Sequence, residues 1–329
     1  MGFKFIDKIR RHAAVSSGNF GTMFKDVDFP PLPEAATKLI EEVNKPDPDL
    51  QRIVKVISSS PETAACVIRT VNSSFFALRN EVRSVKHAVT LLGLKHIRPI
   101  ALSYAVMNSL PHPKESIFNH KAFWSDSLIR AIFARALARR HCKSEEEEAF
   151  TAMLLADLAL PVLMVTWGEY YMPIIEEWKA GTERLSEIEQ SNFKWNHAQA
   201  AAWVMKSWGL PEELICYVGL HNALPSVIRD NELEKTIALP MAVASMFPSS
   251  LRDNPARNRM FIESSIIEFS LSFSDMEDLI KDSREAFSDI QASFHLTGNT
   301  VIEKLDSLIM TVQEMRNESD EETERQGAA

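Results

Sequence analysis

The chain has 329 residues, 45% of them hydrophobic and 25% charged, and its formal net charge is −9 at pH 7. This composition is typical of a globular protein and excludes disorder over most of the length. The negative charge disfavours a general polyanion-binding protein, although a local basic patch can operate on an acidic chain. Because the length exceeds that of one typical domain, we expect two helical lobes, or one lobe with an extension.

Cysteines and apolar segments indicate the compartment. Cys66, Cys142 and Cys216 lie far apart without a Cys-x-x-Cys pair, so neither a zinc knuckle nor a disulfide framework is predicted. Residues 1–12 lack the apolar stretch of a signal peptide. The most apolar segment, residues 153–167, is too short to span a bilayer comfortably and is predicted to be buried core. We therefore expect a cytoplasmic chain without membrane insertion.

Apolar residues recur at three- and four-residue spacing through nearly the whole chain, which predicts an all-α fold. The first expected helix buries one face, made up of Ala35, Ala36, Leu39, Ile40 and Val43. The second buries Leu50, Ile53, Val54 and Ile57. Asp49 and Ser60 are expected to cap the second and third helices. Ser84 begins a fourth, which Gly93 closes in a left-handed conformation.

A break between Pro111 and Pro113 predicts a lobe boundary near residue 115, and a second helical group follows to about residue 222. The charge run at residues 145–148 is expected to be a solvated helix start. Residues 196–199 have the spacing of a capping box. The chain remains helical beyond this group, which predicts a C-terminal helical extension.

A short heptad stripe precedes an acidic tail at residues 317–329. The stripe consists of Val301, Leu305, Leu308, Val312 and Met315. A stripe this short usually packs on its own domain, and the alternative is a homodimer contact through the same five residues.

Two groups of motifs resemble the HDOD (HD-related output domain) proteins, which are bacterial relatives of the HD metal-dependent phosphohydrolases. In the first lobe the motifs are Phe29 to Pro33, Ser60-Pro61, Val71 to Phe76, Val82 to Val85 and His87 to Gly93. In the second lobe they are Trp124 to Ser127, Leu154 to Asp157, Asn196 to Ala198 and Trp208 to Pro211. The resemblance spans roughly residues 24 to 225, and the ordered string of motifs is more specific than any one of them.

The resemblance implies a two-lobed all-helical HDOD fold with a degenerate HD-type second lobe. We expect a basic segment at 1–23 and an HDOD domain at 24–228, divided into lobes at 24–115 and 116–228. The helical extension then covers 229–316. The family is generally described as signal-transducing, without an established general catalytic activity. The implied function is a non-catalytic regulatory module that binds an unidentified signalling protein or small ligand.

An active HD hydrolase holds a metal ion with a first histidine, a His-Asp doublet and a distant aspartate. Such a cation lowers the pKa of a bound water and polarises a phosphoester. In the resemblance, the first histidine falls on Asp126 and the doublet on Ala156-Asp157, while later histidines fall on His197 and His221. Asp126, Asp157, His197 and His221 are therefore the ligand-binding candidates of a degenerate pocket.

The distant aspartate would fall near Ala244-Ser245, where no carboxylate stands, and Ser60 replaces the usual aspartate before Pro61. With two central imidazoles also missing, we expect no catalytic residue, no cofactor and no metal, and weak metal-dependent phosphohydrolysis is the alternative. Asp157 lies in an apolar stretch, where an unpaired carboxylate would cost several kcal/mol. We expect a helix-terminal cap or an ion pair with His197 there, and the functional alternative is an inherited pocket that senses a small molecule.

A DNA-binding regulator is a further alternative, because the helices on either side of residues 58–60 resemble a helix-turn-helix in length. The second of these helices offers only Arg69 as a base, which is a poor set for phosphates and base edges. Arg252, Arg257 and Arg259 could form a patch with the basic start at residues 4–11. Nucleic acid is therefore disfavoured as a partner.

Overall fold

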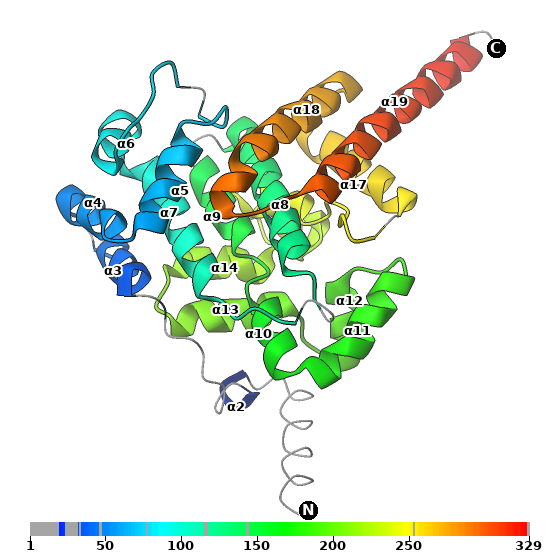
Figure 1. Cartoon of the computed structure of the whole chain (residues 1–329). Helices are drawn as coiled ribbons and strands as arrows, with labels where there is room; N and C mark the ends of the chain where they lie inside the picture. The colour runs from blue at the N-terminus through cyan, green and yellow to red at the C-terminus, as the bar shows by residue number, and fades with distance from the viewer. Residues whose placement is uncertain are drawn as a thin grey trace, which may run out of the picture.

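The computed structural model describes residues 20–23, 32, 34–45, 48–76, 78–114, 118–142, 145–252 and 254–327. These residues form helices joined by turns and contain no β-strand, so the predicted all-α class is confirmed. Figure 1 shows the long helix α8 (His120–His141) running through the middle of the molecule, with the other helices arranged around it.

The N-terminal lobe contains α3 (Glu34–Val43), α4 (Leu50–Ser58), α5 (Pro61–Val71), α6 (Val85–Leu92) and α7 (Leu94–Ser109), preceded by α2 (Phe20–Met23). Asp49, Ser60 and Ser84 accept hydrogen bonds from backbone N–H groups in the first turns of α4, α5 and α6, so all three predicted caps are confirmed. Ser60 thus starts α5 without the aspartate that the family usually has. Gly93 ends α6 with a φ of 80°.

The predicted inward faces of α3 and α4 are largely confirmed. Ala36, Leu39 and Ile40 are buried on α3, as are Ile53 and Ile57 on α4. The side chains of the other two residues expected on the α3 face lie outside the described part of the chain. On α4 the prediction was wrong for the first residue, Leu50, which is 45% exposed.

The second lobe adds α9 (Glu146–Leu154), α10 (Ala159–Thr166), α11 (Gly168–Ala180), α12 (Leu185–Phe193), α13 (His197–Ser207) and α14 (Glu212–Leu220) to α8. The segment Glu146–Thr166, which comprises α9, α10 and the turn between them, is apolar and long enough to cross a membrane by length and composition alone. However, 89% of its most apolar window is buried inside the protein. The prediction that this stretch is buried core is confirmed.

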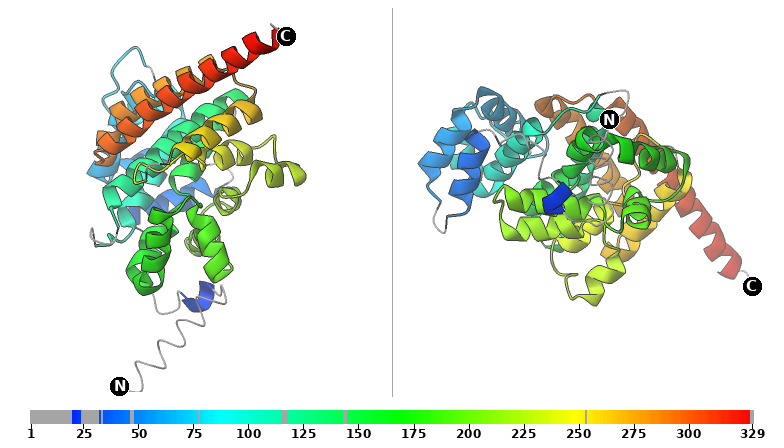
Figure 2. Two further views of the ribbon diagram at one scale, coloured as in Figure 1. Left: turned by 90° about the vertical axis from the view of Figure 1, so that its right-hand side faces the viewer. Right: turned by 90° about the horizontal axis from the view of Figure 1, so that it is seen from below.

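The extension consists of α15 (Pro225–Asp230), α16 (Ala238–Ala244), α17 (Pro255–Phe269), α18 (Phe273–Ile290), the 3-10 turn η1 (Gln291–Phe294) and α19 (Asn299–Gly327). Figure 2 shows α17, α18 and α19 running side by side along α8. Because α16, α18 and α19 all pack directly on α8, the extension and the second lobe share one core.

The predicted heptad stripe lies on α19 and is buried within its own chain, with each of its five side chains at most 9% exposed. It packs where α19 meets α17, α18 and α8. This burial agrees with the expectation that the stripe packs on its own domain. The acidic residues expected as a tail continue α19, and Glu318 pairs there with Arg259 of α17.

A buried ion pair joins α8 to α9, and it corrects the expectation that residues 145–148 are solvated. The carboxylate of Glu147 is fully buried, and its Oε1 lies 2.7 and 2.9 Å from two nitrogens of Arg135 and 2.9 Å from Nδ1 of His96. Burial opposes ionisation of Glu147, but His96 and Arg135 hold its pKa below the ordinary value. The predicted solvent exposure was wrong for Glu147, because the residues that pair with it lie on other helices, α8 and α7.

Replacing Glu147 with alanine should lower the free energy of unfolding by about 3–5 kcal/mol, because the Arg135 guanidinium would remain buried without its carboxylate. Urea denaturation measures this loss. Glu146→Ala is the matched control, since Glu146 pairs with the half-exposed Arg139 and its loss should cost about 0–1 kcal/mol. Equal losses in the two variants would contradict the assignment of the buried pair.

Candidate functional site

Asp157 lies in the turn between α9 and α10 and is only 4% exposed. Its Oδ2 is 2.6 Å from Nη2 of Arg130, and its Oδ1 is 3.1 Å from Nε2 of His221 and 3.2 Å from Nε2 of His197. Burial disfavours the charged carboxylate, but the Arg130 charge and the two histidine contacts hold its pKa well below the ordinary value. The predicted pairing with His197 is present, and it is one of three contacts.

His197 is the first residue of α13, directly after the capping-box residue Asn196. Its backbone N–H and its Nδ1 both donate to Oε2 of Glu189, at 2.8 and 2.6 Å, and Tyr171 donates to the other oxygen of Glu189 at 3.2 Å. Burial opposes protonation of the ring. The charge of Glu189 and the hydrogen bonds to Asp157 and Glu189 outweigh it and raise the pKa of His197 to about 10.

Asn222 opposes protonation of the His197 ring. Its Oδ1 accepts from Nη2 of Arg184 at 2.9 Å, which turns its amide nitrogen to within 2.8 Å of Nε2 of His197. A donor at this position favours the neutral ring. Two buried carboxylates favour the protonated ring, and full charges in a buried site outweigh one amide dipole. We therefore assign the raised pKa to His197.

His221 follows the last residue of α14 and is 1% exposed. Its Nδ1 lies 2.7 Å from the carbonyl oxygen of Val218, and its Nε2 faces Asp157. Burial lowers the pKa of His221, although the hydrogen bond to Asp157 opposes this. A neutral ring has a single proton for these two acceptors, so one of the two contacts lacks its hydrogen.

Asp157, His197 and His221 are the candidate metal ligands, because one ligand atom from each lies within 4.8 Å of the others. Both histidines direct Nε2 to the carboxylate and hold Nδ1 against a protein oxygen, which is the usual arrangement of metal-binding histidines. The donor atoms thus fit a divalent cation. The electrostatics do not, because Arg130 already places a positive charge 2.6 Å from Asp157.

Asp126 stands apart from this cluster. It lies in the second turn of α8 and accepts hydrogen bonds from the hydroxyl of Ser249 at 2.6 Å and from the backbone N–H of Ser250 at 3.1 and 3.2 Å. Burial raises its pKa, although Arg130 and the two serines oppose this. The structure therefore brings three of the four candidate residues together and gives the fourth its own partners in the extension.

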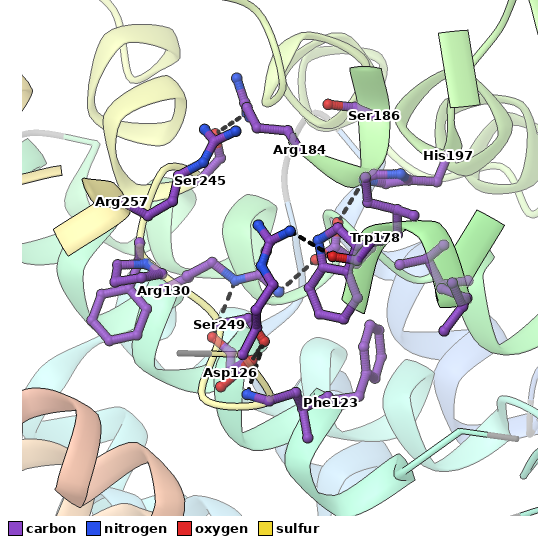
Figure 3. A pocket seen from close by; sticks show the side chains of 18 of the residues that line it. Phe123, Asp126, Arg130, Trp178, Arg184, Ser186, His197, Ser245, Ser249 and Arg257 are labelled. Carbon is purple, nitrogen blue, oxygen red and sulfur yellow. Dashed lines mark hydrogen bonds and ion pairs between the residues drawn. The ribbon is translucent and has the colours of Figure 1, made fainter. Parts of the chain in front are cut away.

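A cavity of about 410 Å³ lies over these groups, and Asp126, Asp157 and His197 all line it. Figure 3 shows Arg130 between Asp126 on one side and Arg184 and Arg257 on the other, and all four residues line the cavity. Sequence reasoning missed Arg130, Glu189, Arg184, Asn222 and Ser249. Of these five residues, only Arg130 could have been found from the sequence, because it follows Asp126 by four residues and both therefore lie on one face of a helix. Ser245, at the expected place of the distant aspartate, accepts a hydrogen bond from Arg184.

The arginines considered for a nucleic-acid patch have other contacts. Arg252 and Arg257 line the cavity, and Arg259 pairs with Glu318. Arg69, on the supposed recognition helix, donates to the carbonyl oxygen of Ser293. Residues 4–11, expected to join such a patch, lie outside the described part of the chain.

Comparison with known proteins identifies the family of this chain. Residues 29–224 match the HDOD domain family. The chain belongs to this family. An uncharacterised protein of Treponema pallidum (strain Nichols) is 22% identical over 199 residues, which are 60% of this chain and 38% of that protein. The chain therefore spans less than half the length of that relative.

Solved structures show the same fold. An HDOD domain protein of unknown function from Geobacter sulfurreducens has a TM-score of 0.64 at 16% identity, over 87% of this chain and 97% of that chain. A protein from Shewanella amazonensis SB2B, named as a candidate phosphohydrolase, has a TM-score of 0.59 at 19% identity, over 93% and 98%. One from Marinobacter aquaeolei VT8, named as a candidate signal-transduction protein, has a TM-score of 0.63 at 21% identity, over 87% and 66%. At these identities the likeness shows the fold alone.

The raised pKa of His197 predicts a pH-dependent stability. Its ordinary value is 6.5 and its value in the folded protein is about 10, so the stabilisation from the protonated ring is complete below pH 6.5 and is lost as pH rises toward 10. The advantage of the native protein over His197→Gln should therefore shrink by a few kcal/mol across that range, since each pKa unit corresponds to ~1.4 kcal/mol.

Chemical denaturation at several pH values measures this difference. His87→Gln, which changes an exposed histidine on α6, serves as control and should keep the slope of the native protein. A constant difference between the native protein and His197→Gln from pH 6.5 to 10 would contradict the assignment.

Proposed function

We propose that this HDOD protein is a non-catalytic regulatory module in bacterial signal transduction, which acts by binding a signalling protein or small ligand at the cavity over Asp157. The observation that supports this proposal is the contact between Arg130 and Asp157. In an HD hydrolase the charge of such a carboxylate is balanced by a metal ion. Here a guanidinium group of the protein balances it.

A guanidinium in place of a metal ion changes the chemistry that the site can support. A metal ion activates water because it binds the water oxygen directly and lowers its pKa, whereas a guanidinium has no vacant coordination position and only donates hydrogen bonds. The position of the first histidine holds Asp126, whose carboxylate accepts from Ser249 and Ser250 and thus serves the packing of the extension. These substitutions favour binding over turnover.

A weak metal-dependent phosphohydrolase is the second candidate, and one observation favours it. His221 has one proton for two acceptors, and a cation bound to its Nε2 would remove this mismatch. Asp157, His197 and His221 would hold that cation, which would supply an activated water. Arg130 would have to move away from Asp157 first.

Hydrolysis assays separate these two candidates. We expect the purified protein, supplied with Mn²⁺, Zn²⁺ or Mg²⁺, to hydrolyse p-nitrophenyl phosphate, nucleotides and cyclic dinucleotides no faster than Asp157→Asn does. Metal analysis of the same samples should give well below one ion per chain. Metal-dependent turnover that Asp157→Asn abolishes would overturn the proposal and establish the second candidate.

Replacing Arg130 tests whether its guanidinium balances the charge of Asp157. Arg130→Gln leaves the buried carboxylate of Asp157 without its strongest partner, so we expect a loss of about 3–5 kcal/mol in unfolding free energy in the presence of EDTA. Zn²⁺ should restore part of this loss while stabilising the native protein much less, because the guanidinium no longer opposes the ion.

Arg139→Gln is the matched control for this experiment. It lies on the same helix, pairs at the surface with Glu146, and should cost about 0–1 kcal/mol without any response to Zn²⁺. Equal stabilisation of the native protein and Arg130→Gln by Zn²⁺ would show that Arg130 does not take the place of a metal.

A further inference from the structure

The cavity carries more positive charge than its own carboxylates balance. Among the described residues, Arg130, Lys179, Arg184, Arg252 and Arg257 line it together with two aspartates and no glutamate. The aspartates have other partners, because Asp157 is paired with Arg130, and Asp126 accepts hydrogen bonds from Ser249 and Ser250. Neither aspartate is paired with Arg184, Arg252 or Arg257 within the described residues.

These three arginines bind neutral oxygens. Arg184 donates to the carbonyl and side-chain oxygens of Asn222 and to Ser245. Arg252 donates to backbone carbonyls at the end of α11, and Arg257 donates to the carbonyl of Thr182.

Carboxylates are scarce around them. Within the described residues, no carboxylate lies at ion-pair distance from Arg184 or Arg252, and Arg257 has only the half-exposed Glu187 at 3.6 Å. Burial lowers the pKa of Arg184; the charge of Glu187 opposes this, and the positive charges of Arg257 and Arg130 reinforce it. Holding these charges together is unfavourable, so an anion in the cavity would be stabilised.

Donor groups remain for such an anion. The hydrogen bonds described for Arg257 use Nε and Nη2, those of Arg184 use Nη1 and Nη2, and those of Arg130 use Nε and Nη2. Each guanidinium thus retains at least one nitrogen without a described protein acceptor. Guanidinium groups offer planar pairs of N–H donors that suit phosphate oxygens in particular.

Aromatic side chains also line the cavity, and one of them lies beside an arginine. Phe123, Trp178 and Phe247 line it, and Figure 3 shows Phe123 and Trp178 beside each other near Asp126. The guanidinium of Arg252 lies 4.9 Å from the ring centre of Trp178. A volume of about 410 Å³ is within the range of small-molecule sites, which join a few placed polar groups to apolar walls.

We infer that this cavity binds a phosphorylated small molecule with an aromatic body, of the nucleotide class, with its phosphate on Arg184 and Arg257 and its body against Trp178. The inference rests on the proposed function, since it names the ligand class of the same site. Arg252 and Arg257 follow the end of the HDOD match at residue 224. The ligand therefore links the family domain to α17 of the extension.

Calorimetric titration of the full chain tests the inference. The probes are AMP and GMP, the uncharged nucleosides adenosine and guanosine, inorganic phosphate, and citrate as an anion without phosphorus. We expect a nucleotide to bind at least about tenfold more tightly than its nucleoside, with an affinity that falls as salt rises. Arg257→Gln should weaken nucleotide binding about tenfold or more, and Arg257→Lys should weaken it less.

Arg259→Gln is the matched control. It lies two residues away on the same helix, pairs with Glu318 and should leave the affinity unchanged. If Arg257→Gln does not fold, Arg184→Lys replaces it and should weaken nucleotide binding several-fold. The inference is overturned if neither nucleotide binds at millimolar concentration, if nucleosides or citrate bind as tightly as nucleotides, or if arginine replacement leaves binding unchanged.

These outcomes are separate from those of the hydrolysis assay. Nucleotide binding accompanied by metal-dependent turnover would overturn the regulatory proposal and leave the ligand class standing. Absence of both binding and turnover would overturn the ligand class and leave the regulatory proposal standing.

Discussion

The buried carboxylate of Asp157 is the constraint around which the second lobe is arranged. A carboxylate that is 4% exposed would cost several kcal/mol without compensation, and its stabilisation comes from Arg130 of α8 and from two histidines that follow in the chain. These contacts fix the turn between α9 and α10 against α8, α13 and α14. Its charge is balanced within the protein, and this sets the chemistry that the cavity can support.

A continuous set of polar contacts extends from this carboxylate to Tyr171. Asp157 contacts His197, His197 contacts Glu189, and Glu189 accepts from Tyr171, so each buried group is satisfied by the next. Removing any member leaves a neighbour buried without its partner, which is the costly case for polar groups in a core. Stability alone therefore accounts for the presence of these buried polar residues.

The predictable parts of this protein are those determined by neighbours in the sequence. The cap at Asn196 and the helix end at Gly93, which has a positive φ, follow from residues within one helical turn, and the apolar surroundings of Asp157 showed that it needed a partner. The identity of that partner depended on packing between distant segments, and Arg130 lies 27 residues before Asp157. Glu147 was misread for the same reason, since a run of four glutamates indicates a surface unless an arginine on another helix meets one of them.

The extension completes the site, because groups that lie beyond the HDOD match satisfy residues inside it. Ser249 and Ser250 supply the hydrogen bonds of Asp126, and the segment that carries them leads directly into α17. Since α17 packs on α19, contacts connect the cavity wall with the long C-terminal helix. The Shewanella structure covers 93% of this chain, so the likeness of fold also extends past the family match. A module of this kind is better understood as a domain with its extension than as the domain alone.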